Sequence, residues 1–345
     1  MSVLSGIFLH ALGGGAAASF YLPFKKVRDW AWESYWLISG VAAWILTPLV
    51  VGYLTIPNLM TVLLQSPGKA LGWAFVFGVL WGVGGLTFGL TMRYLGLSLG
   101  YAVALGFSAA FGTLIPPLFE GQFGELLADA GGRWILLGIA VCLAGIATCG
   151  RAGMIKEKEL GSEGARKTIR EYDLRRGLCV ALVCGLLSAC MAFGLAAGRP
   201  IAETAVAHGT RSLWQNNAVL VVVLWGGFLT NFVWCLILNW RNRSFKNYRS
   251  APSTSLGRNY FFSSLAGVIW FLQFFFYGMG STRMGQYDFV SWTLHMSFII
   301  VMSNLWALYL KEWAGSSRRA LRTVKLGIAL ILLSIVVIGY GSSIF

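Results

Sequence analysis

The sequence predicts an all-α integral membrane protein in which ten transmembrane helices form two inverted five-helix repeats. Of the 345 residues, 57% are hydrophobic and 12% are charged, and that charged share is about half of what soluble proteins carry. The apolar residues form runs of roughly twenty, the length that crosses about 30 Å of hydrocarbon. A sequence pattern in the third and fourth runs recurs in the eighth and ninth.

The ten predicted spans follow one another with short connections. The first run begins at Val3 with no basic region before it, so we expect a retained first helix and not a cleaved signal. Glycine and polar residues dilute the starts of the fourth and ninth spans. The spans cover residues 3–22, 35–55, 71–91, 97–118, 134–152, 177–198, 216–239, 259–280, 286–310 and 326–344.

The basic residues predict the orientation of these spans in the bilayer. Of the 27 lysines and arginines, 22 lie in the first, third, fifth, seventh and ninth connections or, in the case of Arg151, at the span end next to one. Cytoplasmic connections hold the excess of such residues, so the odd-numbered connections are expected inside and both termini outside, in the periplasm. The acidic fourth connection, with Glu120, Glu125 and Asp129, agrees with this orientation.

The two halves of the chain share a pattern that indicates an inverted repeat. The run Gly78-Val79-Leu80-Trp81 recurs as Gly267-Val268-Ile269-Trp270, and glycines follow each tryptophan at the same two distances. Because five spans per copy is an odd number, the second copy must enter the bilayer upside down, as in secondary transporters. We therefore expect a first half at 1–152, a charged cytoplasmic connector at 153–176 and a second half at 177–345.

Ionisable side chains within the spans are the candidates for proton coupling, because such groups are costly in hydrocarbon. His10 lies in the first span and His295 in the ninth, and Asp288 precedes His295 by seven residues. That spacing places Asp288 and His295 on one face of a continuous helix, where a carboxylate and an imidazole could relay a proton. Two alternatives stay open: neutral histidines that hydrogen-bond between helices, and Asp288 as a helix cap.

Aromatic residues surround a glutamine in the middle of the eighth span, which predicts a substrate site. Sugar sites combine rings that pack on the apolar face of a pyranose with amides that bond its oxygens. Packing and interfacial belts are the alternative use of such aromatic residues. The candidate substrate-binding residues are Gln273, Trp270, Tyr277, Trp292, Phe275 and Asn304.

Several classes of function are excluded or disfavoured by what the sequence lacks. It contains no G-x-x-x-x-G-K-[ST] run, so ATP-driven transport by this chain is disfavoured. The six cysteines have no metal-ligand spacing, and no paired carboxylates or nucleophile arrangement indicates an enzyme. The net charge of +14 comes from connections between apolar spans and does not indicate nucleic acid. We expect no metal and no cofactor.

Several stretches together resemble a known transporter family. They are Phe20-Tyr21-Leu22-Pro23-Phe24-Lys25-Lys26-Val27, Thr91-Met92-Arg93-Tyr94-Leu95-Gly96, Trp270-Phe271-Leu272-Gln273-Phe274-Phe275-Phe276-Tyr277, Gln286-Tyr287-Asp288, Ser291-Trp292-Thr293-Leu294-His295-Met296-Ser297-Phe298 and Leu310-Lys311-Glu312-Trp313. This resembles the L-rhamnose–proton symporter family, a ten-helix branch of the drug/metabolite transporter superfamily.

The resemblance implies that L-rhamnose, or a closely related deoxy-sugar, enters with a proton across a bacterial inner membrane. The proton is then the coupling ion, and the sugar and the lipid bilayer are the partners. Two alternatives stay open. One is an exporter or facilitator of another small metabolite, and the other is a membrane sensor or subunit that transports nothing.

Overall fold

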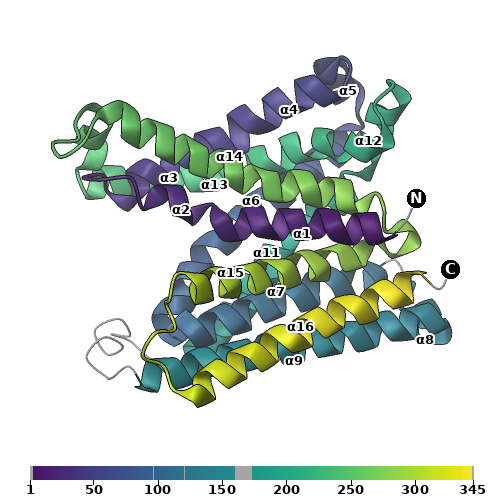
Figure 1. The fold of residues 1–345 in the computed structure, drawn as a ribbon. Coiled ribbons are helices and arrows are strands. Elements are labelled where there is room, and N and C mark those ends of the chain that lie inside the picture. Colours follow the sequence, from purple (N-terminus) through teal and green to yellow (C-terminus); the bar gives the residue numbers. More distant parts are fainter. Residues whose placement is uncertain (1–2, 96, 120, 160–172, 344–345) are drawn as a thin grey trace. The chain divides into compact units, whose positions relative to one another are not determined.

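The computed structural model describes residues 3–95, 97–119, 121–159 and 173–343. Its long helices correspond to the predicted apolar runs (Figure 1). The elements of the first half, short and long, are α1 (Val3–Ser19), α2 (Tyr21–Phe24), α3 (Trp32–Val41), the π-helical turn η1 (Ala42–Leu46), α4 (Thr47–Thr55), α5 (Leu59–Gln65), α6 (Gly68–Leu95), α7 (Leu97–Phe119), α8 (Phe123–Ala128) and α9 (Ala130–Glu159).

The second half continues after the connector, of which residues 160–172 lie outside the described part. Its elements are α11 (Leu174–Ala197), α12 (Arg199–Ala207), the 3₁₀ turn η2 (Ser212–Trp214), α13 (Asn216–Arg241), the 3₁₀ turn η3 (Ser244–Arg249), α14 (Leu256–Ser281), the 3₁₀ turn η4 (Gly285–Val290), α15 (Ser291–Tyr309) and α16 (Arg318–Ser343).

Nine helical segments of the described chain are long and apolar enough to cross a membrane. The predicted fourth span coincides with α7, whose apolar part, Ala102–Leu118, is shorter. Some helices extend past the predicted spans: α16 begins at Arg318 and not at residue 326, and α9 ends at Glu159 and not at residue 152. Hydropathy detects only the apolar middle of a helix, whereas long basic side chains let the helix continue into the interface.

The described residues form two compact units, and each unit draws on both halves of the sequence. Unit 1 comprises Met1–Gly14, Gly84–Ala192 and Gly280–Phe345, and unit 2 comprises Gly15–Val83 and Phe193–Met279. Four helices therefore belong partly to each unit: α1, α6, α11 and α14. These are the first, third, sixth and eighth predicted spans, so the helices shared between units occupy the same two places in each half.

Within unit 1, α9 and α16 form a close pair and run side by side (Figure 1). Glycines allow this approach: a Cβ at Gly138 would lie 2.5 Å from Cγ1 of Ile338, and one at Gly145 would lie 2.7 Å from Cγ1 of Ile331. Small residues at helix contacts are the usual means of close packing in lipid. The high glycine content is therefore used, at these positions, for helix–helix contact.

Within unit 2, α6 and α14 pack closely on other helices at glycines of the repeated motif. A Cβ at Gly78 of α6 would lie 2.0 Å from the carbonyl oxygen of Val223 on α13, and a Cβ at Gly267 of α14 would lie 2.3 Å from that of Ser39 on α3. The third span thus packs on the seventh, and the eighth span packs on the second. In both contacts, the third span of one half packs on the second span of the other half.

Candidate functional site

The predicted site residues divide between the two units. Unit 1 contains the candidates for proton coupling and two of the substrate candidates, and unit 2 contains the other four substrate candidates. The first group is His10, Asp288, Trp292, His295 and Asn304, and the second is Trp270, Gln273, Phe275 and Tyr277.

The structure brings His10 and His295 together inside unit 1. Both imidazoles are fully buried, and their ring centroids lie 6.4 Å apart at 61°. The space beside them is narrow, because a Cβ at Gly280 would lie 2.8 Å from Cε1 and 2.9 Å from Nε2 of His10. The sequence places these histidines in the first and ninth spans, and nothing in it predicts that the two spans pack together here.

Asp288 stands in a different setting from the one expected. The seven-residue spacing assumed one continuous helix, but Asp288 lies in the 3₁₀ turn η4, in which Tyr287 has non-helical angles (φ −103°, ψ 32°), and α15 begins at Ser291. The expectation of one continuous α-helix from Asp288 to His295 is therefore wrong, and because a 3₁₀ turn changes the angular position of its residues, the seven-residue spacing alone does not fix how the two side chains lie. Glycine 285, with φ 61°, initiates this turn in a conformation that favours glycine.

A hydrogen bond next to Asp288 joins η4 to the start of α9. The hydroxyl of Tyr287 donates to Oδ2 of Asp129 at 2.6 Å, and the same carboxylate accepts from the backbone N–H of Gly132 at 2.8 Å. These bonds, that of Tyr287 foremost, hold the pKa of Asp129 below its ordinary value. Asp129 thus caps α9 and restrains the turn that carries Asp288.

Trp292 serves packing in this structure. It is 2% exposed, and its indole N–H donates to the carbonyl oxygen of Ser108 at 3.0 Å. Its ring fills the space over Gly112, where a Cβ would lie 2.3 Å from Cδ1 of Trp292. The ring centroid of His295 lies 6.4 Å from that of Trp292, so Trp292 forms part of the wall around the histidine pair.

In unit 2, three tryptophans from three helices form an indole cluster, which we define as Trp44, Trp81 and Trp270. Their ring centroids lie 5.3 Å (Trp44–Trp270), 5.7 Å (Trp81–Trp270) and 6.2 Å (Trp44–Trp81) apart. Trp81 and Trp270 are half-buried, and Phe274 packs on both. Each ring belongs to the middle of its predicted span, which is the depth at which secondary transporters bind their substrates.

Gln273 lies one turn from Trp270 on α14. It is 6% exposed, and its Nε2 donates to the carbonyl oxygen of Trp270 at 3.0 Å. This bond orients the amide within the helix. Phe275 stacks on Phe271, with ring centroids 6.4 Å apart, and Tyr277 is 5% exposed, so these two predicted contacts are engaged in helix packing.

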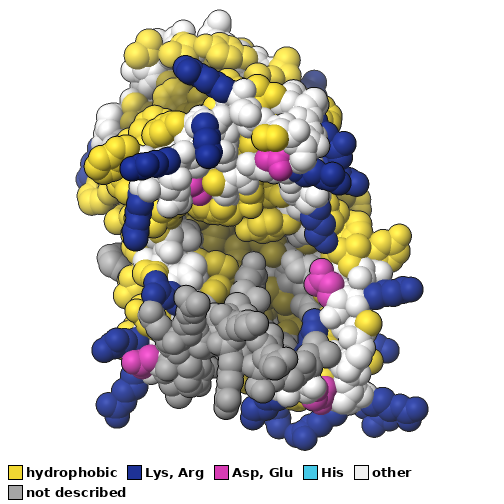
Figure 2. Space-filling model, turned by 90° about the vertical axis from the view of Figure 1, so that its left-hand side faces the viewer, with side chains coloured by type: hydrophobic (Ala, Val, Ile, Leu, Met, Phe, Trp, Pro, Cys, Tyr) yellow, Lys and Arg dark blue, Asp and Glu magenta, His cyan; other side chains and the backbone are white. Residues whose placement is uncertain are grey.

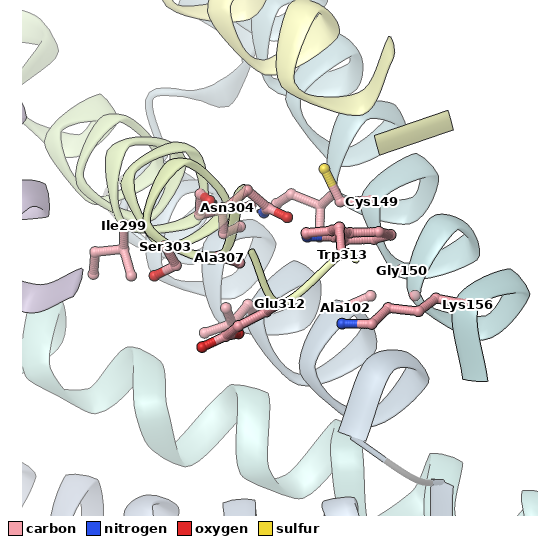
Figure 3. A pocket seen from close by; sticks show the side chains of 14 residues that line it. Ala102, Cys149, Gly150, Lys156, Ile299, Ser303, Asn304, Ala307, Glu312 and Trp313 are labelled. Atoms are coloured by element: carbon pink, nitrogen blue, oxygen red, sulfur yellow. Dashed lines mark hydrogen bonds between the residues drawn. The ribbon is translucent and has the colours of Figure 1, made fainter. Parts of the chain in front are cut away.

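Asn304 lines a cavity of about 310 Å³ in unit 1, formed by α7, α9, α15 and the segment after α15 (Figure 3). Its Nδ2 donates to the carbonyl oxygen of Ile300 at 2.9 Å. Ser303, Glu312 and Trp313 also line the cavity, and Nζ of Lys156 lies 4.9 Å from the centroid of the Trp313 ring. Hydroxyl, amide, carboxylate and ammonium groups thus meet around one space, which suits a hydroxylated ligand.

Two members of the indole cluster, Trp44 and Trp81, are not among the site residues that the sequence predicts. The signal available for Trp81 was its correspondence with Trp270, whereas the π-helical turn that carries Trp44 has no sequence signature. Within the described ranges, no group of three or more His, Cys, Asp or Glu could hold a metal ion.

Comparison with known proteins identifies the family. The family model of the L-rhamnose-proton symport protein (RhaT) matches residues 1–344. The chain belongs to this family. It is 40% identical over 343 residues to the L-rhamnose-proton symporter of Cronobacter sakazakii (strain ATCC BAA-894), covering 99% of this chain and 98% of that protein.

Two further members of the family are similar over the same extent. The L-rhamnose-proton symporters of Yersinia pestis (strain Pestoides F) and Yersinia pseudotuberculosis serotype O:1b (strain IP 31758) are each 38% identical to the chain over 343 residues, with 99% of this chain and 98% of the relative covered. The RhaT family consists of transporters, so the chain is a multi-pass membrane transporter and not an enzyme.

Proposed function

We propose that this chain imports L-rhamnose together with a proton across the bacterial inner membrane by alternating access. The observation that carries the proposal is the 40% identity over 99% of the chain to an L-rhamnose-proton symporter. The similarity covers 99% of this chain and 98% of that protein, so it is not confined to one segment. The alternatives, an exporter or facilitator of another metabolite and a sensor that transports nothing, find no comparable support.

The fold is proposed to be an inverted repeat of two five-helix halves, as in the drug/metabolite transporter superfamily. The reciprocal glycine contacts support this, because Gly78 packs on the seventh span and Gly267 on the second. The contact of Trp81 with its counterpart Trp270 also supports it, since equivalent residues meet where they lie near a two-fold axis. Inverted repeats place the substrate at the middle of the membrane, where the repeats meet.

The two units are proposed to be the bodies that move during transport. They are joined through four helices, with the boundaries at residues 14/15, 83/84, 192/193 and 279/280. Each crossing has a glycine within two residues, at Gly14, Gly84, Gly194 and Gly280. Glycine lowers the cost of bending a helix, so these positions support a hinge in each shared helix.

The sugar is proposed to bind at Gln273 and Trp270, with Phe275 and Tyr277 supporting these contacts from the same helix. A half-buried indole offers its face to the apolar side of a pyranose, and a buried amide offers bonds to the hydroxyls. Asn304 is proposed as a contact within the cavity of unit 1, on the path of the sugar to the cytoplasm. Trp292, whose ring forms part of the wall around the histidine pair, is proposed to contact the sugar from that position.

The proton is proposed to bind at His295, with His10 and Asp288 as the neighbouring titratable groups. Two buried imidazoles 6.4 Å apart cannot both carry a charge at low cost, so the pair binds one proton. The same helix serves both ligands: α14 carries Gln273, and seven residues later Gly280 packs against His10. Seven residues are about two helical turns, so a shift of α14 on sugar binding reaches the histidines.

Coupling between sugar and proton then follows because the ligands stabilise the forms of the carrier to different extents. The empty form and the form with both ligands reorient, whereas the form with one ligand does not, and each ligand raises the affinity for the other. One proton moving through 100 mV releases about 2.3 kcal/mol, which supports a sugar gradient of about 50-fold.

The proposed orientation places both termini in the periplasm. Figure 2 views the side on which α9 ends and α16 begins, and Lys and Arg side chains are spread over it, with few Asp and Glu. The ninth connection leads into α16 on this side, and the positive charge there supports a cytoplasmic location.

The experiment that tests the function uses de-energised cells that express the chain, in weakly buffered medium with a pH electrode. Adding L-rhamnose should make the medium alkaline at once, and a protonophore should abolish the effect. Control sugars should have no effect. If the pH stays constant and labelled L-rhamnose does not enter the cells, the proposed function is wrong.

A further inference from the structure

Trp44 occupies an unusual place in the second membrane helix. It lies in the π-helical turn Ala42–Leu46, between α3 and α4, and is 4% exposed. Single π-helical turns within α-helices occur frequently at functional sites, because the extra residue moves a side chain out of the regular register. A Cβ at Gly40 would lie 2.9 Å from Cζ3 of Trp44, so the six-membered ring of this indole rests on Gly40.

The Trp44 ring meets the other two members of the indole cluster edge to face. Its plane is at 85° to that of Trp270 and at 87° to that of Trp81. By contrast, the planes of Trp81 and Trp270 are at 39° to each other. Trp44 therefore closes one side of the cluster, while the two half-buried rings leave surface for a ligand.

The indole N–H of Trp44 is buried and has no hydrogen-bond partner among the described residues. Two other tryptophans use this group: Trp36 donates to Oδ1 of Asn231 at 3.3 Å and Trp292 donates to the carbonyl oxygen of Ser108 at 3.0 Å. The buried N–H groups of Trp30 and Trp225 also lack a partner among the described residues, but these residues are not members of the indole cluster. Buried indole N–H groups usually find an acceptor, and a donor that lacks one costs free energy. A donor held beside a substrate site indicates an acceptor on the ligand.

The chemistry of the cluster restricts the ligand that can supply this acceptor. Trp44, Trp81, Trp270, Phe274 and Gln273 carry no charge, so this surface offers no cationic partner to a phosphate or a carboxylate. A neutral pyranose matches it, with C–H groups for the rings and hydroxyl oxygens for the donors. We propose that the Trp44 indole N–H donates a hydrogen bond to one hydroxyl of the transported sugar, bound on the indole cluster. This rests on the proposed function.

The test is the KM for L-rhamnose uptake into proteoliposomes by wild type and by Trp44→Phe, which removes the N–H and keeps an aromatic ring. Loss of one hydrogen bond should raise the KM about fivefold to tenfold. Trp44→His, which keeps a ring N–H, should recover part of the affinity. Trp30→Phe is the matched control, because Trp30 is also buried with an N–H that lacks a partner but packs against Tyr248 and Tyr260.

Deoxy analogues of L-rhamnose assign the hydroxyl and separate this inference from packing effects. Wild type should bind one deoxy analogue more weakly than it binds L-rhamnose. The factor should equal the factor by which Trp44→Phe weakens the binding of L-rhamnose. With that analogue, Trp44→Phe should cause no further loss. The assignment would be overturned if the KM of Trp44→Phe equals that of wild type, or if Trp30→Phe raises the KM as much as Trp44→Phe does. It would also be overturned if Trp44→Phe lowers the affinity for every deoxy analogue by the same factor. Absence of uptake by wild type would instead refute the proposed function.

Discussion

Trp81 and Trp270 lie in contact in unit 2, with ring centroids 5.7 Å apart, although one belongs to each half of the sequence. They hold the same place in the repeated motif, and each follows a glycine that packs on a helix of the opposite half. We expect Trp81→Leu and Trp270→Leu each to raise the KM for L-rhamnose about threefold to tenfold.

The double variant should lose less than the product of the two single effects, because both rings serve one surface. Trp73→Leu is the control, since Trp73 is on the same helix as Trp81 but is 50% exposed. Independent, fully multiplicative effects of Trp81 and Trp270 would contradict a shared site. Transport kinetics in proteoliposomes provide the measurement.

Gln273→Ala should weaken sugar binding. The buried amide is the polar group of α14 nearest to Trp270 in the chain, and its loss removes a hydrogen bond to the sugar, which raises the KM about fivefold to tenfold. Gln122→Ala, at an exposed position before α8, should leave the KM unchanged. If the affinity of Gln273→Ala equals that of wild type, Gln273 does not contact the sugar.

His295→Ala and Asp288→Asn should abolish accumulation of the sugar against its gradient. The reason is that a carrier without its proton site cannot form the state with both ligands, which is the loaded state that reorients. His208→Ala is the control, because His208 lies after α12 and bonds to Thr204 and Gln65. Normal accumulation in both variants would refute the relay.

Gly280→Ala should impair coupling more than sugar binding. The added methyl group would lie 2.8 Å from Cε1 of His10, so α14 or the imidazole must shift. We expect the ratio of protons to sugar molecules to fall, with a KM within about twofold of wild type. Gly257→Ala, at the start of the same helix with nothing within 4 Å, should behave as wild type. Equal ratios in both variants would exclude a coupling role for this contact.

The Tyr287–Asp129 bond should make the stability of the purified protein depend on pH in the acid range. The hydrogen bond from Tyr287, followed by that from Gly132, lowers the pKa of Asp129 from 3.8. Its stabilising contribution is therefore present above the unfolded-state pKa and is lost as the pH falls through the folded-state pKa. Melting curves in detergent should place Tyr287→Phe below wild type at pH 7.

This difference between Tyr287→Phe and wild type should disappear once the carboxylate of Asp129 is protonated. Tyr53→Phe, at a position that is 58% exposed, should match wild type at every pH. A difference that persists in acid would mean that Tyr287 stabilises the protein by packing alone.

The sequence by itself determined the class of the protein, most of its helices and the family resemblance. Apolar runs are local properties, because each span must cover the same thickness of hydrocarbon with its own residues. The repeated motif and the basic connections are likewise readable along the chain. The helix ends were less predictable, as the early start of α16 at Arg318 illustrates, because hydropathy does not register a helix that continues into polar surroundings.

Only the tertiary structure decided which side chains meet. The contact of His10 with His295, the 3₁₀ turn that contains Asp288 and the π-helical turn that carries Trp44 depend on how distant helices pack. The division of the chain into two units that share four helices is also a property of contacts. Hydropathy describes how favourably each side chain partitions into an apolar phase. The contacts between distant residues depend instead on how the shapes of the packed helices fit together.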